Sequence, residues 1–295
     1  KIRRLFEKAD ICINLVGILF EKKGGNTFNN IHSIFPSILA KLCKEYNLDH
    51  FIHISALAIN NAIDSDYAKS KLEGEKNILN NFPLSTILRP SVVYSVDDNF
   101  TTNLMTLLNR LPIFPLYYHG KTKFMPIHCS DLTEIIYHVI SKNLFSNIIE
   151  CVGPEEMSFK EIIQKLLILI DKKRILIPFP LFLANLSAKF FQLLPKPLLT
   201  EDQLRLLKYD NILSGKYKTN DDRTYLNYPF IGVGVVVWKG EEFLLIQRGK
   251  PPRKGQWSIP GGRQEIGETV EEAALREIKE ETNLSVQVTD FLGVI

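Results

Sequence analysis

Residues 262–284 read GRQEIGETVEEAALREIKEETNL, and this stretch decides the fold of the C-terminal part of the chain. Thr269 and Glu272 stand three positions apart, which is the pattern of a capping box, where two side chains satisfy backbone amides at the start of a helix. We expect this helix to run to about Thr282. Asn283 follows it, and asparagine tolerates the left-handed backbone of a helix end best after glycine.

Three acidic residues of this helix share one face, because Glu277, Glu280 and Glu281 stand at positions i, i+3 and i+4. Their repulsion would cost roughly a few tenths of a kcal/mol per pair. A hard cation such as Mg²⁺ would remove that repulsion, since it prefers oxygen ligands and keeps water molecules for a phosphate partner. Arg276 precedes Glu280 by four residues and can pair with it, so an ordinary solvated acidic helix is the alternative interpretation.

The surroundings of the helix favour the metal-binding interpretation. A Pro-Gly-Gly turn ends in Gly261 and Gly262 after a β-rich run, and Glu268 stands where the loop meets the helix. With the glutamates of the helix, this arrangement resembles the Nudix box. The family hydrolyses a nucleoside diphosphate linked to a further group and uses Mg²⁺ or Mn²⁺. Residues 248–253, RGKPPR, are similar to those of its ADP-ribose pyrophosphatase-like members.

The resemblance implies a role for each residue of the motif. It makes Glu277, Glu280 and Glu281 the catalytic, metal-binding glutamates, Arg276 the residue that orients a glutamate, Glu268 a structural residue or outer metal ligand, and Gly262 with Gly261 the structural glycines of a tight loop. Asn283 departs from the family, which usually has glycine there. The implied mechanism is metal-assisted attack of water on a phosphorus of the diphosphate, with the metal neutralising charge on the phosphate oxygens.

Residues 10–150 alternate short apolar runs with helical patterns. We expect strands over residues 10–17, 50–55 and 85–90, with helices over residues 28–46 and 67–80 between them. Such a strand–helix–strand rhythm predicts a parallel sheet with crossover helices, which is a Rossmann-type α/β fold. Further on, we expect three more helices: residues 159–170 behind a Ser158–Glu161 capping box, residues 181–194, and one that starts near Thr200.

Tyr67 and Lys71 are one helical turn apart at the start of a predicted helix, so both can reach one ligand. Ser55 ends the preceding strand, and Gly17 ends the first one. Taken with residues 14–19, 89–94 and 125–131, these features resemble an atypical short-chain dehydrogenase/reductase. Over about residues 1–215 they look most like the NAD(P)H-binding accessory subunit of respiratory complex I.

This second resemblance implies a cofactor site made of Tyr67, Lys71, Ser55 and Gly17. In active reductases the tyrosine is the general acid/base, and the lysine lowers its pKa and holds the ribose. In the accessory subunit the nucleotide is structural, so no turnover is implied. The glycine loop that grips the pyrophosphate after the first strand of such folds is absent, and we therefore expect NAD(P)H to bind weakly or not at all.

These patterns divide the chain into a Rossmann-like domain over residues 1–212, a polar linker over residues 213–227, and the N-terminal half of a Nudix domain over residues 228–295. In the last part, β-rich runs 231–238 and 242–248 flank Lys239-Gly240, as in a hairpin. We thus expect an α/β chain: a partial Rossmann-type parallel sheet followed by a partial Nudix α/β/α sandwich of the α+β class. Residue 1 is not methionine, and the Nudix resemblance covers only about half of such a domain, so we expect both ends to be cut from a longer protein.

Composition and charge narrow the partners. The formal net charge of +3 is too small to indicate nucleic-acid binding. The four cysteines have no metal-knuckle or redox-pair spacing, which favours free thiols in a reducing, cytoplasmic compartment. Residues 175–194 are apolar over the length of a membrane span, but Pro178, Pro180 and several polar residues interrupt them. Our first expectation is a buried or interface helix, and our second is contact of residues 181–194 with a membrane surface. A transmembrane span is the least expected alternative.

Two functional hypotheses remain open. The first is a Nudix hydrolase of a nucleoside-diphosphate-type small molecule, fused behind a degenerate Rossmann module. The second is a non-catalytic NAD(P)H-binding accessory or assembly protein of complex I with a vestigial Nudix tail, peripheral at the inner face of a respiratory membrane. An active reductase is the weakest alternative, because the cofactor loop is missing.

Overall fold

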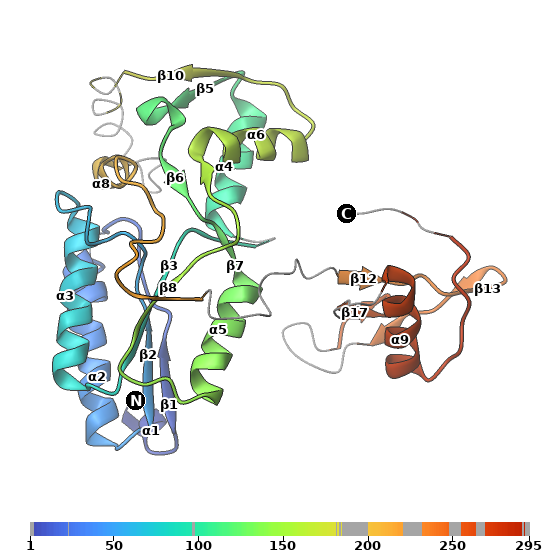
Figure 1. Ribbon diagram of the computed structural model, residues 1–295, viewed down its shortest axis with the longest axis horizontal. Helices are drawn as coiled ribbons and strands as arrows, with labels where there is room; N and C mark the ends of the chain where they lie inside the picture. The colour runs from blue at the N-terminus through green and yellow to red at the C-terminus, as the bar shows by residue number, and fades with distance from the viewer. Residues whose placement is uncertain are drawn as a thin grey trace. The chain divides into compact units, whose positions relative to one another are not determined.

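The computed structural model describes residues 3–22, 24–95, 98–180, 182, 184, 200–220, 232–247, 255–263, 269–290 and 292. The chain forms two compact units, which we call unit 1 (Lys1–Leu226) and unit 2 (Asn227–Ile295) (Figure 1).

In the described part of unit 1, five parallel strands form one sheet in the order β1-β2-β3-β8-β11. The strands are β1 Ile11–Asn14, β2 His50–Ile54, β3 Thr86–Pro90, β8 Ile148–Cys151 and β11 Lys218–Thr219. The prediction of a parallel sheet is confirmed, and the three predicted strands are its first three members. β3 is buried along its whole length, as expected of a central parallel strand.

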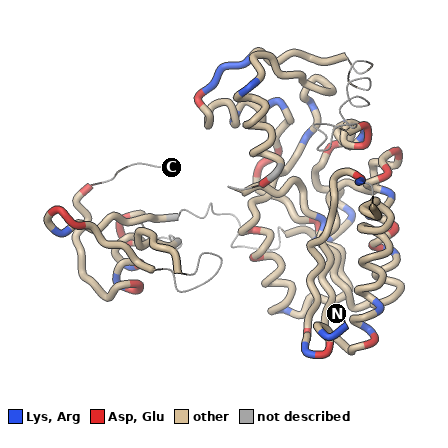
Figure 2. The backbone as a smooth tube through the Cα atoms, turned by 180° about the vertical axis from the view of Figure 1, so that it is seen from behind, with Lys and Arg blue, Asp and Glu red and all other residues tan. Residues whose placement is uncertain are grey.

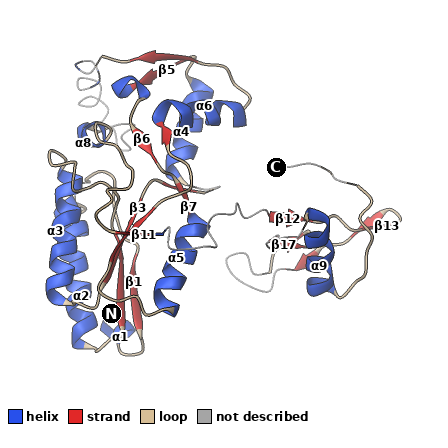
Figure 3. Ribbon diagram, in the orientation of Figure 1, coloured by secondary structure: helices blue, strands red, loops and turns tan. Residues whose placement is uncertain are grey.

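Helices cover both faces of this sheet. Figure 3 shows α2 (Phe35–Glu45) and α3 (Asp66–Asn81) on one side and α5 (Cys129–Ser141) on the other. Successive side chains of a strand point to opposite faces of the sheet. Phe51 of β2 packs with α2 and α3, whereas Ile52 packs with α5. This is the Rossmann-type arrangement that the residue pattern predicted.

The helix predicted over residues 28–46 is divided. A wider π-helical segment, η1 (Asn29–Ile34), leads into α2, where Pro36 stands in the first turn. Proline suits that position because it has no amide hydrogen to donate to the preceding turn.

A second core in unit 1 lies beyond the carboxyl ends of the main strands. It gathers α4 (Asn99–Arg110), α6 (Phe159–Leu169) and a parallel pair of strands, β5 (Ile113–Leu116) and β10 (Ile175–Pro178). The capping box of Ser158 and Glu161 is present at the start of α6. Of the helix predicted over residues 181–194, all but Phe182 and Ala184 lie outside the described residues.

The remaining elements of unit 1 are short. They are α1 Arg3–Phe6, β4 Val93–Tyr94, η2 Tyr117–Gly120, β6 Lys123–Phe124, β7 Ile127–His128, β9 Met157–Ser158 and α8 Glu201–Leu206. β4 pairs with β7, and β6 pairs with β9. α8 starts with a capping box of Thr200 and Gln203, so the helix expected to start near Thr200 is present.

Part of the stretch predicted as a linker belongs to unit 1. Lys218 and Thr219 form the edge strand β11, and the guanidinium of Arg89 lies 4.5 Å from the ring centre of Tyr217. The side chain of Asn220 accepts the amide of Val152 at 2.9 Å and donates to its carbonyl at 2.7 Å. These contacts are long-range, so the polar local sequence gave no sign of them.

Unit 2 consists of short antiparallel strand pairs and one helix. β12 (Gly232–Gly234) pairs with β17 (Gly261–Arg263), β13 (Trp238–Lys239) with β14 (Glu242–Phe243), and β15 (Ile246–Gln247) with β16 (Trp257–Ser258). The predicted hairpin is present, and its turn is Gly240-Glu241, since Lys239 pairs with Glu242.

The helix of unit 2 is α9 (Val270–Thr282), which buries Ala273, Ala274 and Ile278. Its capping box of Thr269 and Glu272 is present, and Asn283 ends it with left-handed backbone at φ 58°. Both helix-end predictions are therefore confirmed. Within the described residues of either unit, no helix is long and apolar enough to cross a membrane.

Candidate functional site

The predicted metal-binding helix α9 packs against the backbone of β17. The amide of Gly261 donates to the Glu281 carboxylate at 3.0 Å. A Cβ atom at position 262 would lie 2.1 Å from the carboxyl carbon of Glu277, so only glycine leaves room for that carboxylate. The two glycines of the motif therefore place two of its glutamates against one strand.

Arg276 connects the glutamates of α9 to one another. Its guanidinium lies 2.9 Å from Glu277 and 3.6 Å from Glu280, which confirms the predicted pairing with Glu280. The side chain of Glu277 is 14% exposed and that of Glu280 is 60% exposed. Glu277 is thus held between Arg276 and Gly262, whereas Glu280 faces solvent.

The donor chemistry of α9 suits a hard divalent cation, because three carboxylates stand on one helix near a strand backbone. As the side chains lie, no group of three His, Cys, Asp or Glu within the described ranges converges closely enough to hold a metal ion. Each of the three carboxylates has another partner instead: Arg276 contacts Glu277 and Glu280, and the Gly261 amide binds Glu281. Glu268, the further predicted ligand, lies outside the described residues.

In unit 1, the structure brings the predicted cofactor residues together around Lys71. The Lys71 ammonium donates to the carbonyl of Ile54 at 3.1 Å, next to Ser55. The same nitrogen lies 5.9 Å from the ring centre of Tyr67 and would be 3.6 Å from a Cβ atom at Gly17. Four residues from three separate segments of the chain thus share one corner of the sheet.

His32 of η1 belongs to this cluster, although no local sequence signal marked it. Its Nε2 accepts the amide of Ile18 at 3.1 Å, and its Nδ1 lies 3.0 Å from the Ser70 hydroxyl. The imidazole meets the Tyr67 ring edge-on, with centroids 5.1 Å apart. His32 therefore ties the chain after β1 to helix α3.

Burial shifts the pKa of all three titratable side chains in this cluster. It lowers the pKa of Lys71 to about 8. Burial and then the charge of Lys71 lower the pKa of His32 to about 3. Burial and then the charge of Asp202 raise the pKa of Tyr67 to about 12. A general acid works best with a pKa near the working pH, so Tyr67 is poorly suited to that role here.

Two buried polar atoms near the end of β2 have no hydrogen-bond partner among the described residues. They are the hydroxyl of Ser55 and Nε2 of His53. Buried polar groups are normally satisfied by protein, water or ligand. A bound polar group at this end of β2 would suit both atoms.

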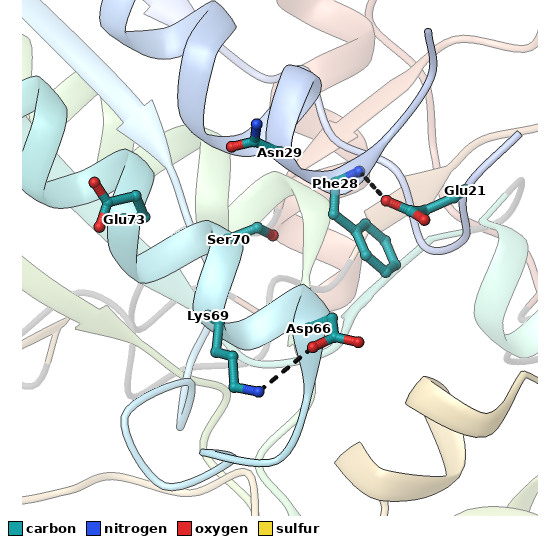
Figure 4. Close-up of a pocket in the computed structure, with 7 residues that line it drawn as sticks. All are labelled: Glu21, Phe28, Asn29, Asp66, Lys69, Ser70 and Glu73. Carbon is teal, nitrogen blue, oxygen red and sulfur yellow. Dashed lines mark hydrogen bonds and ion pairs between the residues drawn. The ribbon is translucent and has the colours of Figure 1, made fainter. Parts of the chain in front are cut away.

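An open cavity of about 450 Å³ adjoins the cluster. Its lining comes from α3 and from the chain around η1, namely Glu21, Phe28, Asn29, Asp66, Lys69, Ser70 and Glu73 (Figure 4). Phe28 connects the cavity to the cluster, because its ring contacts both His32 and Tyr67. The lining has three acidic side chains, Glu21, Asp66 and Glu73, and one lysine, Lys69. Its net negative charge does not suit the binding of a pyrophosphate.

Comparison with known proteins agrees with the two motifs. Residues 229–295 match the NUDIX domain family. An ADP-ribose pyrophosphatase of Methanocaldococcus jannaschii is 44% identical over 87 residues, which are 30% of this chain and 51% of that protein. The C-terminal part of the chain is thus a Nudix domain.

The first unit is similar to a mitochondrial protein, NADH dehydrogenase [ubiquinone] 1 alpha subcomplex subunit 9. The Mus musculus protein is 25% identical over 215 residues, covering 72% of this chain and 56% of its own length. The Arabidopsis thaliana protein is 24% identical over 266 residues, covering 86% and 64% respectively. This chain therefore spans about half to two thirds of the length of these curated relatives.

Solved structures resemble the same unit in fold. A dTDP-4-dehydrorhamnose reductase from Clostridium acetobutylicum has a TM-score of 0.53 at 16% identity, with 70% of this chain and 83% of that chain covered. A UDP-glucuronic acid 4-epimerase from Bacillus cereus in complex with NAD has a TM-score of 0.52 at 21% identity, with 60% and 66% covered. These likenesses show a Rossmann-type parallel-sheet fold for unit 1.

Proposed function

We propose that the Nudix domain formed by residues 229–295 hydrolyses a nucleoside diphosphate linked to a further group, with an ADP-ribose-like molecule as the substrate class. The observation that carries the proposal is the packing of α9 on β17, where Gly261 binds Glu281 and Gly262 makes room for Glu277. A solvated acidic helix would need no such glycines. The similarity to an ADP-ribose pyrophosphatase supports the choice of substrate class.

In this proposal Glu277, Glu280 and Glu281 hold Mg²⁺ or Mn²⁺, with Glu268 as a further or outer ligand. The metal supplies positive charge to the phosphate oxygens. Arg276 orients the carboxylate of Glu277 through its contact at 2.9 Å. Gly261 fixes Glu281 through its amide. Glu280, which Arg276 contacts at 3.6 Å, is exposed and can be reached by a metal ion from solvent.

Hydrolysis of a nucleotide panel tests the proposal. ADP-ribose, NADH, dinucleoside polyphosphates and oxidised dNTPs would be incubated with the protein, with and without Mg²⁺. We expect metal-dependent cleavage that Glu281→Gln abolishes. Glu271→Gln is the matched control, because Glu271 lies on the same helix, is exposed and is none of the proposed metal ligands. Cleavage that survives in Glu281→Gln, or no metal-dependent cleavage of any compound in the panel, would refute the hydrolase.

The second candidate function concerns unit 1, and the cluster of Gly17, Ser55, Tyr67 and Lys71 favours it. We propose that this unit binds NAD(P)H weakly, without turnover, and associates with respiratory complex I at the inner face of the membrane. The similarity to the NADH dehydrogenase subunit supports this candidate. Contact of residues 181–194 with the membrane surface is part of it.

Two measurements test the second candidate. Fluorescence titration with NADPH should show binding that is weakened in Lys71→Met but not in the exposed-site control Lys76→Met. Native electrophoresis of solubilised respiratory membranes should place the protein with complex I. A protein that stays in the soluble cytoplasmic fraction and binds no NADPH would contradict the candidate.

A further inference from the structure

The strand pair β5–β10 has an apolar face that stays exposed among the described residues of unit 1. Ile175 stands opposite Ile113 in the register, and Ile177 stands opposite Pro115. These three isoleucines are exposed, at 63%, 47% and 40% for Ile175, Ile113 and Ile177. The alternate residues, Phe114 and Leu176, pack inward on α4 and α6. The pair therefore buries one face and presents the other, equally apolar, to solvent.

More exposed apolar side chains stand next to this face in the sequence. Leu111 precedes β5, and Ile168 and Leu169 end α6, just before the loop into β10. An exposed apolar face on a folded unit marks an interaction site. We name the outer face of Ile113, Ile175 and Ile177 the β5–β10 face.

The charges around the β5–β10 face are mostly positive. Lys172, Lys173 and Arg174 lead directly into β10, and Arg110 stands three residues before β5, against the single acid Asp171. Figure 2 shows the basic segment in blue at the upper edge of the larger unit. Arg174 is fixed there, because its guanidinium donates to the carbonyls of Leu108 at 2.7 Å and Asn109 at 3.1 Å.

We propose that the β5–β10 face docks on an anionic lipid bilayer surface. Exposed isoleucines beside lysine and arginine combine apolar insertion with attraction to negative headgroups, the two contributions that hold monotopic proteins at a membrane interface. A protein partner would have to offer an apolar patch and a negative rim together, whereas an anionic bilayer offers both everywhere. The surface does not involve the hydrolase site, so the proposal is independent of the Nudix activity.

Vesicle sedimentation of the full chain tests the proposal. The probes are phosphatidylcholine vesicles, alone and with about one third phosphatidylglycerol. We expect binding to the anionic vesicles only, and its loss at about 1 M salt, where the Debye length is about 3 Å. Lys172→Glu with Lys173→Glu should weaken binding by about tenfold or more. Ile175→Ser with Ile177→Ser should also weaken it, through the apolar contribution.

Matched controls come from α1, at the opposite end of unit 1 (Figure 1). Arg4→Glu with Lys8→Glu makes the same charge change, and Leu5→Ser removes an equally exposed apolar side chain. Hydrogen exchange of the unchanged protein should show protection of residues 172–177 on vesicle addition, which requires no variant to fold. Equal binding to neutral vesicles, equal loss in the controls, or a protein bound at this face without any vesicle binding would overturn the proposal.

Discussion

A carboxylate oxygen of Asp202 accepts the backbone amide of Tyr67 at 3.0 Å, across 135 residues of sequence. The same carboxylate accepts the amide of Asp66 at 2.7 Å and the hydroxyl of Ser65 at 2.8 Å. Asp202 thus satisfies the first turn of α3, the turn that carries Tyr67, and its charge suits the positive end of the helix. The helix that carries the predicted cofactor residues Tyr67 and Lys71 is therefore held in place by a side chain from α8.

Replacing Asp202 by alanine should therefore destabilise unit 1. Loss of a capping side chain costs roughly 0.5–2 kcal/mol, and we expect about 2 kcal/mol here because three donors lose their acceptor. Urea unfolding followed by circular dichroism measures the change. Lys76→Ala, at an exposed position of α3, is the control and should change stability by less than about 0.5 kcal/mol. An Asp202→Ala protein as stable as this control would refute the capping role.

Acid should destabilise unit 1 through His32. Burial and the charge of Lys71 lower the pKa of His32 to about 3 in the folded protein, below the ordinary value of 6.5. The unfolded chain therefore binds the proton first, and the free energy of unfolding falls as the pH drops from about 6.5 toward 3. At pH 5 the expected loss from this residue is about 2 kcal/mol.

His32→Gln isolates that contribution, since glutamine keeps a donor and an acceptor but does not titrate. Unfolding free energies at pH 5, 6 and 7 should depend less steeply on pH in this variant, by up to about 1.4 kcal/mol per pH unit. His53, whose pKa burial also lowers well below its ordinary value, keeps part of the slope in both proteins. Identical slopes would show that His32 does not carry the effect.

Lys71→Met should make unit 1 more stable at pH 7. Burial lowers the pKa of Lys71 from 10.5 to about 8. At neutral pH the amine is charged, so its removal from water destabilises the folded state. Removing the amine should raise the free energy of unfolding by about 3 kcal/mol. The lost hydrogen bond to Ile54 should lower it by about 1–2 kcal/mol. The unchanged protein should also become more stable between pH 8 and 10.5, whereas the variant should not. A variant that is less stable at pH 7 would contradict this reasoning.

Adjacent glycines in β17 should respond differently to alanine. At position 261 the added Cβ would lie 2.1 Å from the carbonyl oxygen of Val233, a backbone atom that cannot give way without separating β12 from β17. At position 262 it would meet the carboxylate of Glu277 instead, the end of a side chain that can turn aside without moving the backbone. Gly261→Ala should cost roughly 1–3 kcal/mol of stability. Gly262→Ala should keep the fold and lose the proposed hydrolysis, as measured by circular dichroism and nucleotide cleavage on the same samples.

Local sequence patterns predicted those helices and strands that depend on interactions between residues close in sequence. The strand at His50–Ile54 is an apolar run, and the boundaries of α9 follow from its capping box and Asn283. β11 was missed because Lys218 and Thr219 are polar, and its pairing with β8 is a long-range event. His32 and Asp202 were missed for the same reason. Each acts on α3 from a distant segment, and neither residue type in isolation indicates such a partner.

The contacts that complete unit 1 come from the residues of this unit that the ribosome makes last. Asn211 donates to the carbonyl of Leu57 across 154 positions, and Asn60 donates to Tyr217 across 157. A ribosome that adds about 5–20 residues per second needs on the order of ten seconds between the emergence of β3 and that of β11. During that interval the nascent sheet has an open edge and α3 has an incomplete cap. Chains that terminate before Asp202 should therefore be cleared by proteases, so premature stops in this region act as complete losses of the protein.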